Sequence, residues 1–232
     1  MSSTIPIPRT LPGALFTLFT LPSVYRPQAD TRLLAAALAQ EELGPHTDVL
    51  EIGTGTGVLA LHAARRGAAT VTAVDVSWPA VVTARMNALL HRLPLRVLHG
   101  DFAERTHGRR FDLIVTNPPY VPAPGTRLPP RGAERAWDAG PDGRLVIDRI
   151  CEAAASLLRP GGALLMVHSG MCGAETTVDR LTGEGLSATI AARASVPWGP
   201  VLRSRRTWLE RQGLAAADEQ REELVVIRAR NL

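Results

Sequence analysis

The side chains best suited to chemistry lie in the run Asn117, Pro118, Pro119 and Tyr120, which follows a short apolar segment at residues 111–116. That segment has the length of a buried parallel strand, and the two prolines prevent its hydrogen-bond ladder from continuing. The chain must therefore turn out at the strand's carboxyl end, which faces the ligand crevice in open α/β sheets. Asn117 and the carbonyl of Pro118 could accept both hydrogens of a planar NH2 group, with Tyr120 as a flat surface beside it. The structural alternative is a strand followed by a proline-rich turn.

A glycine-rich loop follows an earlier strand candidate, residues 48–52. Gly53, Gly55 and Gly57 are spaced two apart, so the backbone can approach a ligand closely. The dinucleotide fingerprint GxGxxG is not met, because position 58 is valine. A phosphate-binding loop of the GxxxxGK type needs a lysine, and the chain has none. The loop therefore disfavours a nicotinamide or nucleoside triphosphate cofactor.

Acidic residues stand at the ends of three successive strand candidates. Asp75 could accept hydrogen bonds from both hydroxyls of a ribose, and Glu51 could act through its charge on a cationic ligand. Asp101, with Phe102 beside it, offers a carboxylate for an adenine amino group. Each acid alone is typical of a solvated or capping residue, but together they predict a site for a nucleoside-bearing ligand.

The elements that would position these residues alternate between strand and helix patterns, which is typical of βαβ units and a parallel sheet. A turn is expected at residues 159–162, a loop over the crevice at 122–143 and an arginine-rich insertion at 197–221. We expect strands at residues 48–52, 70–75, 95–98, 111–116, 163–168, 187–195 and 223–229, and helices at 58–66, 78–90, 144–158 and 175–184.

Composition limits the function classes. The 232 residues, 45% of them hydrophobic, predict one domain with an N-terminal extension. The net charge of +4 comes with 26 basic residues that are all arginine. Arginine suits phosphate recognition, so a nucleic-acid partner is one reading, and a solvated surface of mixed charge is the other.

Cysteine usage and hydropathy indicate the cellular setting. Cys151 and Cys172 lack metal-ligand or CxxC spacing, which argues against structural zinc or a disulfide scaffold. The apolar segment 11–24 is interrupted by Pro12 and Pro22, so we expect neither a membrane span nor a signal peptide. A reducing, cytoplasmic location follows.

The ordered motifs resemble those of class I S-adenosylmethionine-dependent methyltransferases, from about Val24 to the C-terminus. The resemblance implies an α/β, Rossmann-like fold with a mostly parallel seven-stranded sheet and helices on both faces. Residues 1–45 would be an N-terminal extension that packs on the core and closes over the cofactor, and 46–232 the methyltransferase domain.

Two further segments resemble the HemK-like protein-glutamine N-methyltransferases, in the shorter subgroup without a large N-terminal bundle. Residues 24–31 (VYRPQADT) are similar to a motif preceding the core, which implies that Asp30 and Thr31 approach the cofactor. The loop 136–143 (AWDAGPDG) resembles the one following Asn-Pro-Pro-Tyr in that subgroup, although Ala139 replaces a usual glycine. In the related family, release factors carry a Gly-Gly-Gln target, and one type depends on a small activating partner.

Together, the residue chemistry and the resemblance predict S-adenosyl-L-methionine as cofactor and no metal. The expected reaction is methyl transfer to a planar NH2 nitrogen, most simply a glutamine or asparagine side-chain amide of a protein or peptide. Catalysis is assigned to Asn117, Pro118, Pro119 and Tyr120, and cofactor binding to Tyr25, Asp30, Thr31, Glu51, Gly53, Thr54, Gly55, Gly57, Asp75, Val76, Asp101, Phe102 and Asn117.

Two other functions stay open. An exocyclic base amine in RNA or DNA presents the same planar NH2 group, and Arg203, Arg205 and Arg206 could then grip phosphates while Trp208 stacks on a base. The second is a noncatalytic binding subunit with the cofactor fold, although such subunits commonly lose the glycine loop or the Asn-Pro-Pro-Tyr run.

Overall fold

The computed structural model describes residues 16–232. The first 15 residues of the expected N-terminal extension, and the start of the apolar segment 11–24, lie outside this range. Every helix within this range is too short or too polar to span a lipid bilayer.

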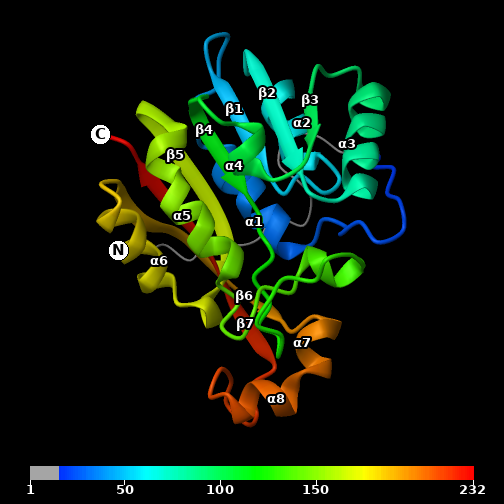
Figure 1. Ribbon diagram of the computed structural model, residues 1–232, viewed down its shortest axis with the longest axis vertical. Helices are drawn as coiled ribbons and strands as arrows, with labels where there is room; N and C mark the ends of the chain where they lie inside the picture. Colours follow the sequence, from blue (N-terminus) through cyan, green and yellow to red (C-terminus); the bar gives the residue numbers. More distant parts are fainter. Residues whose placement is uncertain (1–15) are drawn as a thin grey trace.

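The described residues form one seven-stranded sheet in the order β3-β2-β1-β4-β5-β7-β6 (Figure 1). Strands β1 to β5 run parallel and β7 pairs antiparallel with both β5 and β6. The mostly parallel α/β sheet is confirmed. The strands are β1 (Asp48–Ile52), β2 (Thr70–Asp75), β3 (Arg96–His99), β4 (Phe111–Thr116), β5 (Leu158–Ser169), β6 (Ser187–Pro197) and β7 (Arg221–Arg230).

Helices cover both faces of the sheet. In Figure 1, α4, α5 and α6 lie in front of it, while α1 and α2 lie behind. The central strands are therefore buried on both sides, which explains why β4 reads as a nearly continuous apolar run. The helices are α1 (Ala29–Leu38), α2 (Val58–Arg65), α3 (Trp78–His91), α4 (Phe102–Arg105), α5 (Leu145–Leu157), α6 (Ala174–Gly183), α7 (Pro200–Ser204) and α8 (Arg206–Arg211), with short 3-10 helices η1 (Ala133–Ala136) and η2 (Gly170–Cys172).

The turn expected at residues 159–162 is wrong, because β5 already begins at Leu158. Leu158 pairs with Phe111 and Ala163 with Leu113, so the intervening residues form an irregularity within the strand. Backbone hydrogen bonds between Asn231 and both Gly161 and Gly162 hold this segment in place. Pro160, Gly161 and Gly162 thus form a bulge within β5, and the strand continues through them.

The strand order reverses between β1 and β4, and this reversal positions the chemistry. Ile52, the last residue of β1, pairs with Thr116, the last residue of β4. The glycine loop and the Asn117 run therefore leave the sheet side by side at its carboxyl edge. In open α/β sheets this point is where ligands bind.

The insertion at 197–221 folds into α7 and α8 and projects at the same end of the molecule (Figure 1). It has a small apolar core of its own, formed by Trp198, Leu202 and Leu209. Arg205 ties it to the loop after β4, through an ion pair of 2.6 Å with Asp138 and a hydrogen bond to a backbone carbonyl. The insertion is thus an extra wall beside the carboxyl edge of the sheet.

Candidate active site

A cavity of about 750 Å³ lies at the carboxyl edge of the sheet. Its wall combines the segment before α1, the glycine loop, the end of β2, the run after β4, the loop around η1, the start of α7 and the start of β7. That volume is typical of small-molecule and cofactor sites.

The glycine loop forms one side of the cavity. Gly53 and Gly55 both have positive φ, at 71° and 53°, which a residue with a side chain rarely adopts. The loop is held by the end of β2, because Asp75 accepts hydrogen bonds from the backbone N–H groups of Gly55 (3.0 Å) and Ser77 (2.8 Å). Asp75 also lines the cavity, and burial raises its pKa. A carboxylate with one backbone bond on each oxygen keeps lone pairs for ligand hydroxyls.

Glu51, at the base of the same loop, is only 2% exposed. It accepts hydrogen bonds from the Thr54 hydroxyl and from the backbone N–H of Ala60 (3.2 Å). Burial raises the pKa of Glu51 to about 8, although these two hydrogen bonds lower it, and the charge of Asp75 adds a smaller increase. No described side chain pairs with it as a cation, so a cationic ligand in the cavity would stabilise its charged form.

Asp30 joins the opposite side of the cavity to the run after β4. Its carboxylate is 3% exposed, and one oxygen, Oδ2, receives hydrogen bonds from the Tyr25 hydroxyl (3.0 Å), the Tyr120 hydroxyl (3.1 Å) and Asn117 Nδ2 (3.1 Å). The other oxygen accepts from the backbone N–H and hydroxyl of Thr31. Burial and the charge of Asp30 both raise the pKa of Tyr25 and of Tyr120, so these hydroxyls stay protonated as donors.

This arrangement fixes the orientation of the Asn117 amide. A carboxylate only accepts hydrogen bonds, so the Asn117 atom facing Asp30 must be the NH2 group. The amide oxygen Oδ1 is then directed away from Asp30, with Asn117 itself part of the cavity wall. The site thus presents a positioned acceptor oxygen to a ligand.

The loop after β4 folds back on this run and shapes its backbone. Val121 exchanges backbone hydrogen bonds with Trp137 (2.7 Å) and Ala139 (3.1 Å), and the Cys172 thiol donates to the Tyr120 carbonyl (3.1 Å). Gly143 lies directly against these atoms. An added Cβ at Gly143 would be 2.4 Å from the Tyr120 oxygen and 2.8 Å from Cys172 Sγ, at a φ of 74°.

Gly143→Ala is therefore expected to lower the free energy of unfolding by roughly 2 to 4 kcal/mol, because backbone must shift and φ is strained. Urea unfolding followed by circular dichroism measures the change. Gly44→Ala is the matched control, since nothing lies within 4 Å of its added Cβ. Equal stability of the two variants would contradict the tight contact at Gly143.

Most residues predicted for the site do meet around the cavity, but three do not line it. Gly57 packs on α3, where an added Cβ would be 3.1 Å from Ala84 Cβ. Asp101 caps α4 by accepting from the Ala103 N–H and forms an ion pair of 2.8 Å with Arg149. Phe102 belongs to the buried core. The predicted residues that line the cavity are Tyr25, Asp30, Thr31, Glu51, Gly53, Thr54, Gly55, Asp75, Val76, Asn117, Pro118, Pro119 and Tyr120.

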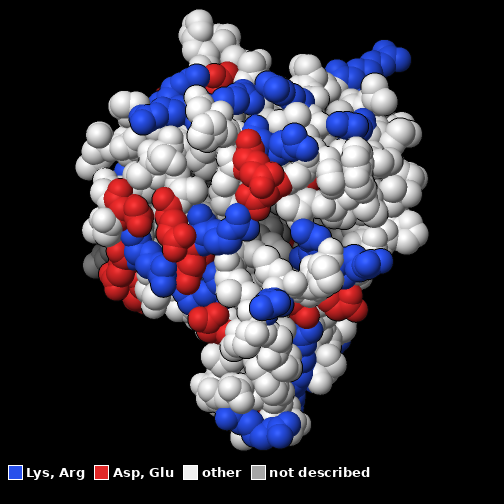
Figure 2. All heavy atoms as spheres, viewed as in Figure 1, with Lys and Arg blue, Asp and Glu red and all other residues white. Residues whose placement is uncertain are grey.

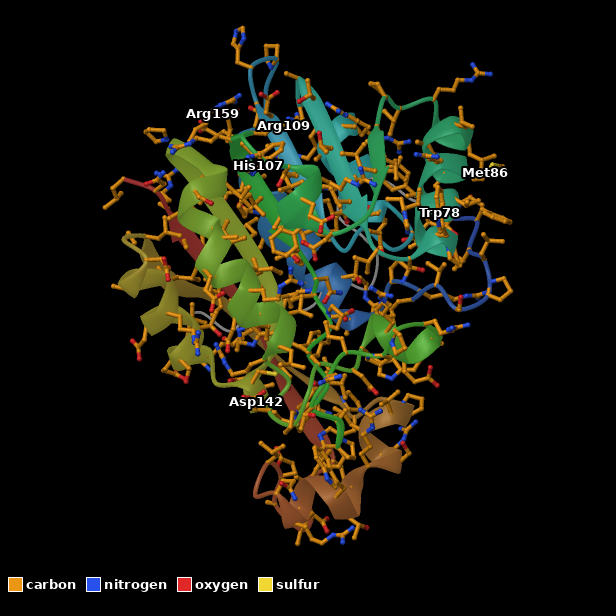
Figure 3. All side chains as sticks on the ribbon, in the orientation of Figure 1. Trp78, Met86, His107, Arg109, Asp142 and Arg159 are labelled. Atoms are coloured by element: carbon orange, nitrogen blue, oxygen red, sulfur yellow. The ribbon has the colours of Figure 1, made fainter. Side chains whose placement is uncertain are left out.

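On the face of the molecule that Figure 2 shows, the basic side chains do not form one continuous patch. Figure 2 shows one group of basic side chains along the upper edge and another at the lower tip, with acidic side chains among and between them. Arg109 and Arg159, labelled in Figure 3, lie at the upper edge, far from α7 and α8. Arg159 is paired there with Asp48 and Asp112.

Glu222 is a cavity residue that the sequence reasoning missed. It is 8% exposed and lies near the start of β7, one residue before the strand expected from residue 223. Alternation along a strand would have placed it on the same face as the buried Leu224 and Val226. The burial of a glutamate by an apolar face is the signal that could have drawn attention to it.

Comparison with known proteins identifies relatives. Residues 16–128 match the family model described as "Methyltransferase small domain". A protein of Methanocaldococcus jannaschii, provisionally named a protein N5-glutamine methyltransferase, is 34% identical over 177 residues, which are 76% of this chain and 88% of that protein. The release factor glutamine methyltransferase of Moorella thermoacetica is 38% identical over 154 residues, covering 62% of this chain and 54% of that protein.

Two solved structures share the fold. The Mtq2–Trm112 complex of E. cuniculi, whose title connects it to methylation of the eRF1 termination factor, aligns with a TM-score of 0.62 at 22% identity, over 90% of this chain and 99% of the matched chain. A T. thermophilus 16S rRNA N2 methyltransferase, solved with AdoMet and guanosine, also gives 0.62, at 26% identity over all of this chain and 50% of that one.

Proposed function

Because the chain belongs to the HemK-like protein-glutamine N-methyltransferases, which carry a methyltransferase small domain, we propose that it methylates the side-chain amide nitrogen of a glutamine in a protein such as a release factor. It is an S-adenosylmethionine-dependent methyltransferase. One observation carries the proposal of an NH2 acceptor: Asp30 holds the NH2 end of Asn117 and leaves its Oδ1 for the hydrogens of the acceptor group.

The residues around the cavity fit S-adenosylmethionine. The backbone of the glycine loop has no side chains at Gly53 and Gly55 to keep an adenosine away. We assign Asp75 to the ribose hydroxyls and Glu51 to the charged methionine end. Val76, which is 38% exposed and follows Asp75, offers an apolar surface for the base. Asp101 would reach the cofactor only after giving up its ion pair with Arg149.

The protein's own residues hold and orient the acceptor. When bound, S-adenosylmethionine supplies an electrophilic methyl group on a positively charged sulfur. An amide nitrogen is a poor nucleophile because its lone pair is delocalised into the carbonyl. Asn117 Oδ1 and the Pro118 carbonyl would accept its two hydrogens and direct the nitrogen toward the donor, and such orientation can contribute on the order of 7 to 11 kcal/mol in favourable cases. Tyr120 keeps the run in place through Asp30.

Cofactor binding is expected to release a proton through Glu51 near neutral pH. A pKa of about 8 leaves most Glu51 carboxyls protonated at pH 7, and the cationic cofactor favours the ionised form, so the pKa falls on binding. Affinity should therefore rise as the pH increases from about 6 to 8. Calorimetry of S-adenosylmethionine binding in buffers of different ionisation enthalpy measures the proton release, which Glu51→Gln should reduce. A binding enthalpy that is the same in every buffer would contradict this coupling.

The proposed activity is tested with purified enzyme, methyl-labelled S-adenosylmethionine and two peptides that differ at one position, Gly-Gly-Gln and Gly-Gly-Glu. The glutamine peptide is expected to gain the mass of one methyl group on its side chain, and the glutamate peptide none. Labelled cell extract, digested separately with protease and nuclease, then identifies the natural class of acceptor. Label that survives protease but is lost to nuclease would refute the protein substrate.

A nucleobase amine is the second candidate, supported by the shared planar NH2 chemistry and by the likeness to the 16S rRNA enzyme. The predicted phosphate grip is weakened in this chain. Arg205 is already bound to Asp138, and Arg206 stacks 5.2 Å above the ring centroid of Trp198. Of the three arginines predicted to contact phosphates, only Arg203 is exposed. The protein amide therefore stays the preferred acceptor.

A small activating subunit and a cytoplasmic location complete the proposal. Exposed apolar side chains follow one side of α3, including Trp78 (57%), Met86 (41%) and Leu89 (73%), and Figure 3 shows Trp78 and Met86 on this helix. A partner would cover this surface, which size-exclusion chromatography of co-expressed proteins can detect. Both described cysteines are free and buried, which suits a reducing compartment.

A further inference from the structure

Glu222 is a buried acid of the cavity that takes no part in the proposed binding of the cofactor or of the acceptor amide. Its side chain lines the cavity, and Oε2 is buried without a hydrogen-bond partner among the described residues. The adjacent Glu223 behaves differently, since it forms an ion pair with Arg193 on the outer side of the strand. Two neighbouring glutamates of one strand thus have opposite environments, one neutralised at the surface and one unpaired in the cavity.

The antiparallel direction of β7 explains how Glu222 reaches the site. Leu224 pairs with Ser169, the last residue of β5, so the residues before Leu224 extend past the carboxyl edge of the sheet. Glu222 pairs with Val196 of β6, and both line the cavity. Within residues 16–232, β7 is the only strand that runs against the others, and it therefore brings the Glu222 carboxyl group into the cavity from the opposite direction.

The groups around Glu222 supply no positive charge. Burial raises the pKa of Glu222 to about 7, the Ser169 hydroxyl lowers it, and the charge of Asp30 raises it. About half of these carboxyls are thus ionised at neutral pH in the free enzyme. The polar and titratable groups that act on Glu222, or on which its charge acts, are Asp30 of α1, Tyr25 before it, Tyr120 after β4, Ser169 of β5 and Cys172 of η2.

The proposed reaction releases a proton inside this cavity, and the other polar groups are poorly suited to accept it. Asp30 Oδ2 already receives three hydrogen bonds and Oδ1 receives two, so its lone pairs are occupied. The Tyr25 and Tyr120 hydroxyls are donors to that carboxylate and stay protonated. The Asn117 amide is not basic. Among the carboxylate oxygens of the described cavity residues, Glu222 Oε2 is the fully buried one that has no hydrogen-bond partner. Glu51 Oε1 also accepts no hydrogen bond, but Glu51 is assigned to the charged methionine end of the cofactor.

We propose that Glu222 is a catalytic residue that accepts the proton leaving the substrate amide nitrogen, an inference that rests on the proposed glutamine methylation. As the new N–C bond forms, the C–S bond of the donor breaks and its electron pair stays on sulfur. One N–H bond of the amide also breaks and its electron pair stays on nitrogen. The proton leaves its hydrogen bond to Asn117 Oδ1 or to the Pro118 carbonyl and goes to Glu222 Oε2. The products are a neutral N-methylamide, a neutral thioether and a protonated Glu222, which returns its proton to solvent. Removal of the proton during transfer avoids an N-protonated amide.

The test compares Glu222→Gln with Glu223→Gln in single-turnover reactions that use saturating S-adenosylmethionine and the Gly-Gly-Gln peptide. Glu222→Gln is expected to slow transfer roughly 10²-fold, at the low end of general base effects because the leaving proton is already acidic. The wild-type rate should fall as the pH drops below about 7, and this acidic limb should be absent in Glu222→Gln. Glu222→Asp should restore part of the rate together with the limb, and Glu223→Gln should keep both. Calorimetry should give unchanged cofactor affinity at pH 7.

A readout independent of turnover is a ¹³C NMR titration of the glutamate carboxyls in the free enzyme. One resonance that titrates near pH 7 should disappear in Glu222→Gln. An active wild-type enzyme with a flat rate from about pH 5.5 to 8.5, or a Glu222→Gln variant with the wild-type rate and limb, would overturn this inference alone. A wild-type enzyme that leaves the glutamine peptide unmethylated at every pH would overturn the proposed function and, with it, this inference. If Glu222→Gln does not fold, the rate of Glu222→Asp and the pH profile of the wild-type enzyme still test whether Glu222 accepts the proton.

Discussion

Asn117→Ala is expected to reduce methyl transfer by about 10³-fold while S-adenosylmethionine affinity changes little. The variant removes the oxygen that Asp30 directs toward the acceptor, so the amide nitrogen is held by the Pro118 carbonyl alone. The effect should lie in kcat, because a freely rotating acceptor amide still enters the cavity. Single-turnover rates with the Gly-Gly-Gln peptide and calorimetry with the cofactor separate the two quantities.

The matched control for Asn117→Ala is Asn231→Ala, which removes an equal side chain far from the cavity. Asn231 Nδ2 donates to the Leu158 carbonyl near the bulge of β5. This variant should keep its transfer rate, and any loss of stability should appear only in unfolding experiments. A near wild-type rate for Asn117→Ala would show that the Asn-Pro-Pro-Tyr run is a structural turn, which is the alternative that its sequence allows.

Local patterns in the sequence predict the elements that position the site. The strands 48–52, 70–75 and 111–116 agree residue for residue with β1, β2 and β4, because each is an apolar run ended by glycine, acid or proline. The same signals fail at residues 159–162, where long-range contacts let the strand continue. Arg159 forms ion pairs with two aspartates, and Asn231 forms backbone hydrogen bonds with Gly161 and Gly162. Those partners lie 47 to 111 residues away along the chain, so no local pattern reveals them.

The candidate site shows the same division between local and long-range information. Residue type and spacing identify the glycine loop, Asp75 and the Asn117 run, since each follows its own strand. The same reasoning predicts that Asp101 contacts the ligand. In this structure its carboxylate instead pairs with Arg149 and accepts a hydrogen bond from the Ala103 N–H of α4. Glu222 was missed because its place depends on how far β7 extends past β5, a matter of register between distant strands.

The role of Asp30 is also a product of tertiary structure. The family resemblance implies only that Asp30 and Thr31 approach the cofactor. In the fold, the first turn of α1 brings the Asp30 carboxylate to Asn117, 87 residues further along the chain, and to the hydroxyls of two tyrosines. Asp30 therefore acts on the acceptor through the Asn117 amide, and we regard it as a positioning residue.

Asp30→Asn is expected to lower kcat about 10²-fold, because a small misplacement of a reacting group can cost that much. The substitution keeps the size of the side chain but replaces one carboxylate oxygen by an NH2 group, which cannot accept a hydrogen bond. Asn117 Nδ2 and the tyrosine hydroxyls on one side, and Thr31 on the other, then share a single acceptor oxygen. The Asn117 amide is then free to rotate and to present its NH2 group to the acceptor, where two donors would face each other. The KM for the Gly-Gly-Gln peptide should change less than kcat. Thr31→Val is the matched control, since it removes only the longer contact of 3.4 Å to Asn117 Nδ2 and one hydroxyl bond to Asp30. If both variants slowed transfer equally, the effect would come from α1 as a whole and the orienting role of the Asp30 carboxylate would be wrong.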